Sequence, residues 1–111
     1  MRKIEWTNDA VDSLNEILVY YKDNAGDNVA IDIYNRIIKE IDILENEKLI
    51  TKQTQELKDI GIFDVYEATI APWKVYYKLK DNNKKAYILF VLDTRRNIEE
   101  ILISKVIDNK I

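Results

Sequence analysis

Basic side chains are concentrated in one stretch of an otherwise acidic chain. The 111 residues carry a formal net charge of -3. Between Pro72 and Arg96, the chain has only two acidic residues, Asp81 and Asp93. The same stretch has seven basic residues: Lys74, Lys78, Lys80, Lys84, Lys85, Arg95 and Arg96. Arginine offers paired donors to a phosphate or carboxylate, and lysine offers a point charge. This stretch is therefore the candidate site for binding an anionic group or an acidic partner.

The spacing of these residues predicts which of them act together. Alternation along a strand places Lys74, Tyr76 and Lys78 on one face, and the turn containing Arg95 and Arg96 follows the next strand at the end where Lys74 lies. Cations that converge near an exposed aromatic ring could hold a phosphate and stack a base. We predict that these five residues bind the target of the protein.

Simpler roles for the same residues stay open. Lysines on a strand commonly form a solvated face or guard a sheet edge. Arg95 could pair with Asp93 or Glu99 and only fix the turn, Tyr76 could be partly buried, and Glu67 on the preceding strand is expected to face solvent.

Composition excludes several kinds of chemistry. The chain has no His and no Cys, which removes the usual neutral-pH general base, the thiolate nucleophile and the common zinc ligands. With only two glycines, it has no glycine-rich phosphate loop. We expect no metal and no cofactor. The absence of disulfides, of a signal peptide and of a membrane-spanning run predicts a cytoplasmic protein.

The elements that must position the basic stretch can be predicted from periodicity. Residues 3–6 alternate as a short strand, and apolar residues spaced for helices follow over about residues 10–24 and 27–44, with Gly26 in the turn between them. The segment 45–61 has weak periodicity. Residues 62–70, 73–79 and 86–92 are rich in aromatic and β-branched residues, as strands are, and residues 98–107 fit a helix or a last strand.

These elements predict one α+β domain over residues 1–111. A short N-terminal strand and a helical hairpin precede a mainly antiparallel sheet, in the order β-α-α-β-β-β plus a terminal element, and the hairpin covers one sheet face. A tight turn at Asn82 and Asn83 would place Lys78 opposite Tyr87 and Lys74 opposite Val91. We expect the other sheet face to be uncovered.

The chain resembles the toxins of the RelE/ParE superfamily, the toxic partners in type II toxin–antitoxin modules of the plasmid-stabilisation type. The resemblance lies in VYEATIAPWKVYYKL, AYILFVL and DTRRN, and in the front half IEWTNDAVDSLNEILVYY. The family pattern is an acidic strand, a break, an aromatic-basic strand, an apolar strand and a basic turn. The matching residues here are Glu67, Pro72, Trp73, Lys74, Tyr77, Phe90, Arg95 and Arg96.

The resemblance implies two possible activities. RelE-like members are ribosome-dependent mRNA interferases, endoribonucleases for which Lys74, Arg95 and Arg96 would be the catalytic cations. The C-terminal segment IEEILISKVIDNKI offers neither the Tyr nor the His that commonly moves protons in these enzymes. ParE-like members bind and inhibit DNA gyrase and need no general acid or base. We place the ParE-like activity first, and a non-toxic module that only binds its antitoxin is the third alternative.

All three alternatives share an antitoxin partner. The resemblance implies that an antitoxin segment covers the functional surface of the toxin. We expect Tyr76, Leu89 and Val91 to form an apolar floor for the antitoxin on the uncovered sheet face, with the lysines and arginines facing antitoxin carboxylates.

Overall fold

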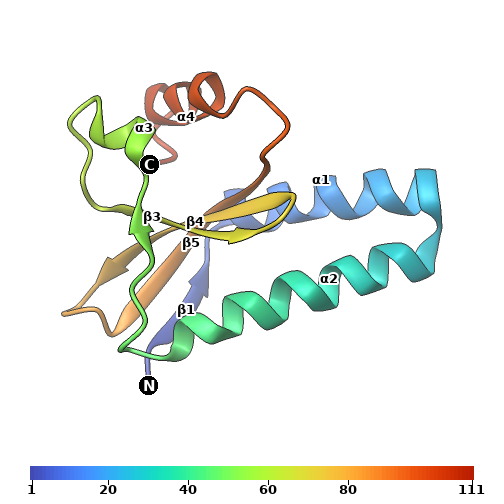
Figure 1. Cartoon of the computed structure of the whole chain (residues 1–111), viewed down its shortest axis with the longest axis horizontal. Coiled ribbons are helices and arrows are strands. Elements are labelled where there is room, and N and C mark those ends of the chain that lie inside the picture. The colour runs from blue at the N-terminus through green and yellow to red at the C-terminus, as the bar shows by residue number, and fades with distance from the viewer.

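A five-stranded sheet separates two layers of helices in the computed structural model, which describes residues 1–111 (Figure 1). The elements in chain order are β1 (Lys3–Trp6), α1 (Asn8–Ala25), α2 (Asp27–Asp42), η1 (Ile43–Glu45), β2 (Lys52–Gln53), α3 (Gln55–Lys58), β3 (Val65–Ile70), β4 (Trp73–Lys80), β5 (Lys85–Asp93) and α4 (Ile98–Ile107). None of these helices is long and apolar enough to cross a membrane.

The strand order β1-β5-β4-β3-β2 confirms the α+β class and the mainly antiparallel sheet. Only β1 and β5 pair in parallel. The apolar strand β5 lies inside the sheet between β1 and β4, as its composition predicts. The turn between β4 and β5 contains Asp81, Asn82 and Asn83 at positive φ, which Asn and Asp tolerate better than most residues.

The residues at the start of α1 and in the turn between α1 and α2 suit their positions in the helical hairpin. The Thr7 hydroxyl accepts a hydrogen bond from the amide of Ala10 and caps α1. Gly26 adopts φ 94° between α1 and α2, a conformation that a side chain would strain. Both helices bury one apolar stripe against the sheet, which confirms that the hairpin covers one sheet face.

The other sheet face is also covered, so the expectation of an open face is wrong. A second apolar cluster lies beneath α3 and α4 and consists of Leu57, Val65, Tyr76, Leu89, Phe90, Leu92 and Leu102. Figure 1 shows α3 and α4 side by side on this face, away from the α1–α2 hairpin. Residues 98–107 thus form a helix, and its N-terminus is capped by Asn97, whose side chain accepts a hydrogen bond from the amide of Glu100.

A bulge in β5 changes which residues share a face. Lys78 pairs with Tyr87 as predicted, but Tyr77 pairs with Ile88 and Tyr76 pairs with Phe90, so Leu89 is the extra residue. Beyond the bulge, the register is shifted by one residue. The predicted pairing of Lys74 with Val91 is therefore wrong, and Lys74 lies opposite Leu92.

Candidate functional site

A groove between α1 and α4, at the C-terminal end of β5, is the candidate site. It has a volume of about 630 Å³. Its lining combines apolar and charged side chains: Ser13, Glu16, Ile17, Tyr20, Tyr21, Trp73, Val91, Leu92, Asp93, Arg95, Arg96, Ile101 and Lys105. We refer to it as the α1–α4 groove. It brings Arg95 and Arg96 of the predicted site together with aromatic residues from α1 and β4.

Arg95 is held in place by two partners. Its Nε donates to Oδ1 of Asp93 at 2.9 Å, and its Nη2 donates to Oδ2 of Asp93 at 2.6 Å and to the Tyr21 hydroxyl at 3.2 Å. These hydrogen bonds lower the pKa of Asp93 below its ordinary value of 3.8 and raise the pKa of the Arg95 guanidinium. The expected pairing of Arg95 with Asp93 is therefore present, and a part for Arg95 in target binding stays a prediction.

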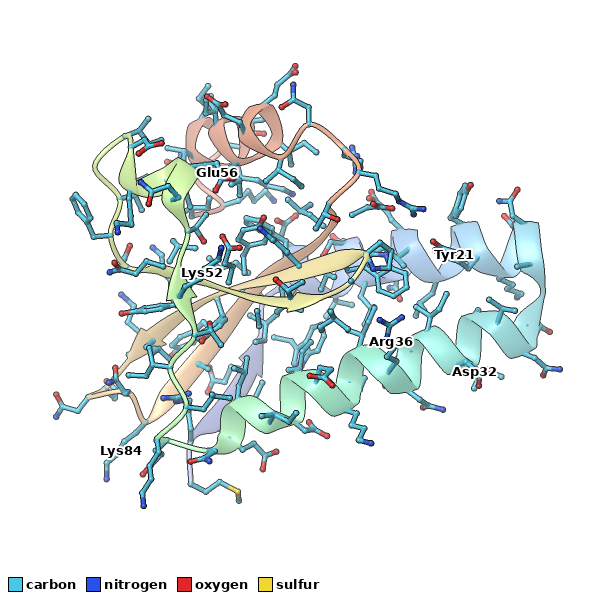
Figure 2. The ribbon with its side chains drawn as sticks, in the orientation of Figure 1. Tyr21, Asp32, Arg36, Lys52, Glu56 and Lys84 are labelled. Atoms are coloured by element: carbon cyan, nitrogen blue, oxygen red, sulfur yellow. The ribbon has the colours of Figure 1, made fainter.

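Aromatic rings connect the turn to the helical hairpin. The Tyr21 ring meets the Trp73 ring edge-on, with centroids 5.9 Å apart, and the guanidinium carbon of Arg36 lies 5.5 Å from the Trp73 centroid. Arg36 also donates to the carbonyl of Ala71. Figure 2 shows Tyr21 on α1 and Arg36 on α2, both at the end of the sheet where β3 turns into β4. The Trp73 ring, which lines the groove, thus contacts both helices of the hairpin.

The remaining charges of the groove differ in whether they are compensated. Lys105 pairs with Asp9 at 2.9 Å, and its Nζ lies 5.2 Å from the centre of the Phe90 ring. Arg96 and Glu16 are exposed, and neither makes an ion pair. Two charges of opposite sign are thus left for a partner on the two sides of the groove.

Lys74 does not join the two arginines. Its Nζ lies 2.6 Å from Oε2 of Glu67, whose side chain is only 2 % exposed, and Lys52 approaches the same oxygen at 3.8 Å. The expectation that Glu67 faces solvent is wrong, because Glu67 is buried on the sheet face that also carries Tyr76. Lys74 therefore compensates a buried carboxylate. Lys78 likewise has a partner, Asp64, at 3.5 Å.

Tyr76 is fully buried, so the stacking platform expected of it is absent from the surface. Its ring packs 5.1 Å from that of Phe90, and its hydroxyl has no hydrogen-bond partner. Burial raises the pKa of Tyr76 above its ordinary value of 10.0, and the nearby carboxylate of Glu67 raises it further. The hydroxyl is consequently a poor proton donor.

The apolar floor expected for an antitoxin is also covered. Leu89 is buried with Tyr76 in the cluster beneath α3 and α4. Val91 packs on the opposite face against the α1–α2 hairpin, because the bulge at Leu89 reverses the alternation. The three residues therefore do not share an exposed face, although Val91 contributes to the lining of the α1–α4 groove.

Several residues of the groove were not predicted as site residues. Glu16, Tyr20 and Tyr21 come from α1, which lies far from the basic stretch in the sequence, and Lys105 comes from α4, which directly follows that stretch. The helical spacing indicated only that Tyr21 belongs to the packed face of α1. The assignment of residues 98–107 to a helix would have been needed to place Lys105 opposite α1. No group of three or more His, Cys, Asp or Glu side chains is arranged to hold a metal ion.

Comparisons with known proteins identify the family. No curated protein matches the chain. The structure resembles a solved structure described as the chromosomal ParDE toxin–antitoxin system from P. aeruginosa, with a TM-score of 0.70 and 18% sequence identity over 84% of this chain and 96% of that chain. Residues 4–98 match the family described as the ParE toxin of the type II toxin–antitoxin system parDE. The chain thus belongs to the ParE toxin family, the toxin half of systems whose other half is an antitoxin.

Proposed function

We propose that this protein inhibits DNA gyrase by binding to it and that a cognate antitoxin neutralises it. Membership of the ParE toxin family supports this proposal. The observation that carries it is the state of the groups that RNA cleavage would need. Lys74 is paired with buried Glu67, and the C-terminal segment has neither the Tyr nor the His that commonly moves protons in the RelE-like enzymes. Lys74, one of the three cations that the RelE-like activity would use, is thus committed to a carboxylate within the fold.

The part of the predicted target-binding set that remains accessible lies in the turn after β5. Arg95 and Arg96 are exposed, whereas Lys74 and Lys78 are mostly covered and paired with carboxylates. We therefore place the gyrase contact at Arg95 and Arg96, beside the aromatic wall of the groove. Arg95 and exposed Tyr20 both line the groove, and Arg and Tyr are among the residues that contribute most to protein interfaces. Such a target places the action of the protein in the bacterial cytoplasm.

Controlled expression without antitoxin tests this function against its alternatives. Protein, RNA and DNA synthesis are pulse-labelled separately after induction. Gyrase inhibition predicts early arrest of replication and DNA breaks while translation continues. Early collapse of translation with cleaved mRNA would instead support a ribosome-dependent endoribonuclease. Normal growth with abundant folded protein would support a module that only binds its antitoxin.

A further inference from the structure

We infer that one end of the sheet binds single-stranded DNA, through lysines on three neighbouring strands and the ring of Tyr87. This surface lies at the start of β5, at the opposite end of that strand from Arg95 and Arg96. The choice of DNA over RNA rests on the proposed function, because gyrase works on DNA. The surface, its ligand and its part in inhibition go beyond that function.

The sheet face that α3 and α4 cover over Tyr76 and Phe90 stays accessible at this end. Register partners on β1, β5 and β4 share a face, so their side chains form two rows there. We call this surface the basic sheet end; its first row is Lys3, Lys85 and Lys80, and its second row is Glu5, Tyr87 and Lys78. None of the six belongs to the apolar cluster beneath α3 and α4, and each is at least partly exposed.

The first row places three lysines directly opposite one another. Lys85 of β5 pairs in register with Lys3 of β1 on one side and with Lys80 of β4 on the other. Like charges in these positions destabilise a sheet. Protection of a sheet edge could explain Lys3, because β1 is an edge strand, but β4 and β5 lie inside the sheet. A bound anion would offset the repulsion among all three.

Acidic neighbours neutralise this row only in part. Lys3 lies 3.5 Å from Glu5, and Lys85 lies 3.7 Å from Asp81. Both distances exceed the roughly 2.7–2.9 Å of a strong charge-assisted hydrogen bond. Lys80 is exposed and makes no ion pair. Loose pairs between exposed groups contribute little, so the phosphates of a nucleic acid could replace them.

Tyr87 adds an aromatic ring to the second row. It is partly exposed and lies between Glu5 and Lys78 in the register of the sheet. Proteins bind single strands by stacking unpaired bases on aromatic rings while cations contact the backbone. The bases of a duplex are already stacked on one another, so this arrangement favours a single strand. The stacking role predicted for Tyr76, which is buried, thus passes to Tyr87.

The net charge of the chain limits the affinity for free DNA. The formal charge is -3, and Figure 2 shows Asp32 on α2 far from Lys84 in the turn between β4 and β5. We expect free DNA to bind with a Kd on the order of 100 µM at physiological salt. The nine residues of β5 separate its ends by about 25 Å. Gyrase held at the other end of β5 would therefore present its DNA at a high effective concentration.

Titration with labelled oligonucleotides tests the surface without gyrase. The full chain is added to a fluorescein-labelled oligothymidylate of about 12 nucleotides, and anisotropy is measured over a range of salt concentrations. Lys80→Gln with Lys85→Gln should weaken binding at least about fivefold at low salt. The same pair should reduce the steepness of log affinity against log salt by about 0.7 for each lysine removed.

A control pair removes the same charge from the helical hairpin. Lys22 and Lys39 are exposed and make no ion pair. Lys22→Gln with Lys39→Gln should keep the affinity within about twofold of wild type, because neither lysine lies near the basic sheet end. This control separates a local contact from the effect of net charge.

Substitution of Tyr87 tests the stacking contact. Tyr87→Leu should weaken binding at least about fivefold without changing the salt dependence, because the ring carries no charge. Tyr87→Phe should restore most of the affinity, since stacking requires only the ring. Circular dichroism and thermal unfolding establish that each variant is folded before its affinity is interpreted.

A second measurement places the surface in the gyrase reaction. Lys80→Gln with Lys85→Gln should bind DNA-free gyrase within about twofold of wild type, but should require at least about fivefold more protein to accumulate broken plasmid. Equal losses in both measurements would show that the basic sheet end contacts gyrase itself, and the inference would be wrong.

The possible failures are distinguishable. If the oligothymidylate does not bind at low salt, or binds the lysine and tyrosine variants like wild type, the inference is wrong whatever gyrase does. An oligouridylate or a duplex that binds more than about tenfold tighter would also overturn it, because the surface would then serve RNA or paired DNA. If the oligothymidylate binds as predicted but gyrase stays active, the proposed function fails and the single-strand surface stands.

Discussion

At the scale of single residues, the basic stretch divides into charges that hold the fold and charges that remain available. Lys74 compensates buried Glu67, whereas Arg96 makes no ion pair within the chain. Removing one member of a buried ion pair is more harmful than removing both, because the remaining charge is left without compensation. Loss of toxicity in a simple Lys74 substitution would therefore not reveal a catalytic role.

A paired substitution separates the structural from the catalytic role of Lys74. Lys74→Met alone should lower the free energy of unfolding by about 2 kcal/mol, because buried Glu67 is then left without compensation, and Lys74→Met with Glu67→Gln should recover much of that loss. If Lys74 only compensates Glu67, the folded double variant keeps its toxicity. Urea denaturation gives the stabilities, and growth after induction gives the toxicity. A stable double variant that is no longer toxic would make Lys74 a functional residue.

The buried hydroxyl of Tyr76 provides a second test at this scale. It has no hydrogen-bond partner, so Tyr76→Phe removes an unsatisfied polar group without changing the packing of the ring. We expect the free energy of unfolding to stay equal or to rise by up to about 1 kcal/mol, with unchanged toxicity. A variant that unfolds normally but loses toxicity would assign the hydroxyl a role in catalysis.

At the scale of elements, α4 decides which surfaces the sheet presents. It covers the cluster around Tyr76 and Phe90, and it forms one wall of the α1–α4 groove. Its attachment includes the buried side chain of Leu102 and the ion pair between Lys105 and Asp9. Tyr76 and Leu89 of the expected antitoxin floor lie in the cluster beneath this helix, whereas Val91 lies on the other sheet face and lines the groove.

Two substitutions on α4 measure how much the packing of this helix contributes to the free energy of unfolding. Leu102 is fully buried, so Leu102→Ala should lower the free energy of unfolding by about 2–4 kcal/mol. Ile103 is 38% exposed, and Ile103→Ala should cost less than about 1 kcal/mol. Urea denaturation of both variants compares them. Equal small losses would show that α4 is not firmly packed on the sheet in solution.

At the scale of the whole molecule, local patterns predicted most of the elements but not their pairing across the chain. Alternation and turn residues predicted β4, β5 and the turn between them at Asn82 and Asn83. The bounds of both strands were correct to within a few residues. The bulge at Leu89 has no sequence signal, because Leu89 lies in a uniformly apolar strand. The face of Val91 and the partner of Lys74 depend on that bulge.

The candidate site was predicted only in part for a similar reason. Arg95 and Arg96 stand in a recognisable turn, and both line the groove. Tyr20, Glu16 and Lys105 reach the same place through the packing of two helices against opposite faces of the sheet. The short spacing of a motif cannot reveal contacts between residues so far apart in the sequence.

Supercoiling by purified DNA gyrase is the most direct test of the central claim. The full chain is added to gyrase, relaxed plasmid and ATP, and the antitoxin is then added to a second sample. We predict loss of supercoiling with accumulation of broken plasmid, and recovery when the antitoxin is present. Undiminished supercoiling at a large molar excess of folded protein, with mRNA cleavage in a parallel translation reaction, would contradict the account.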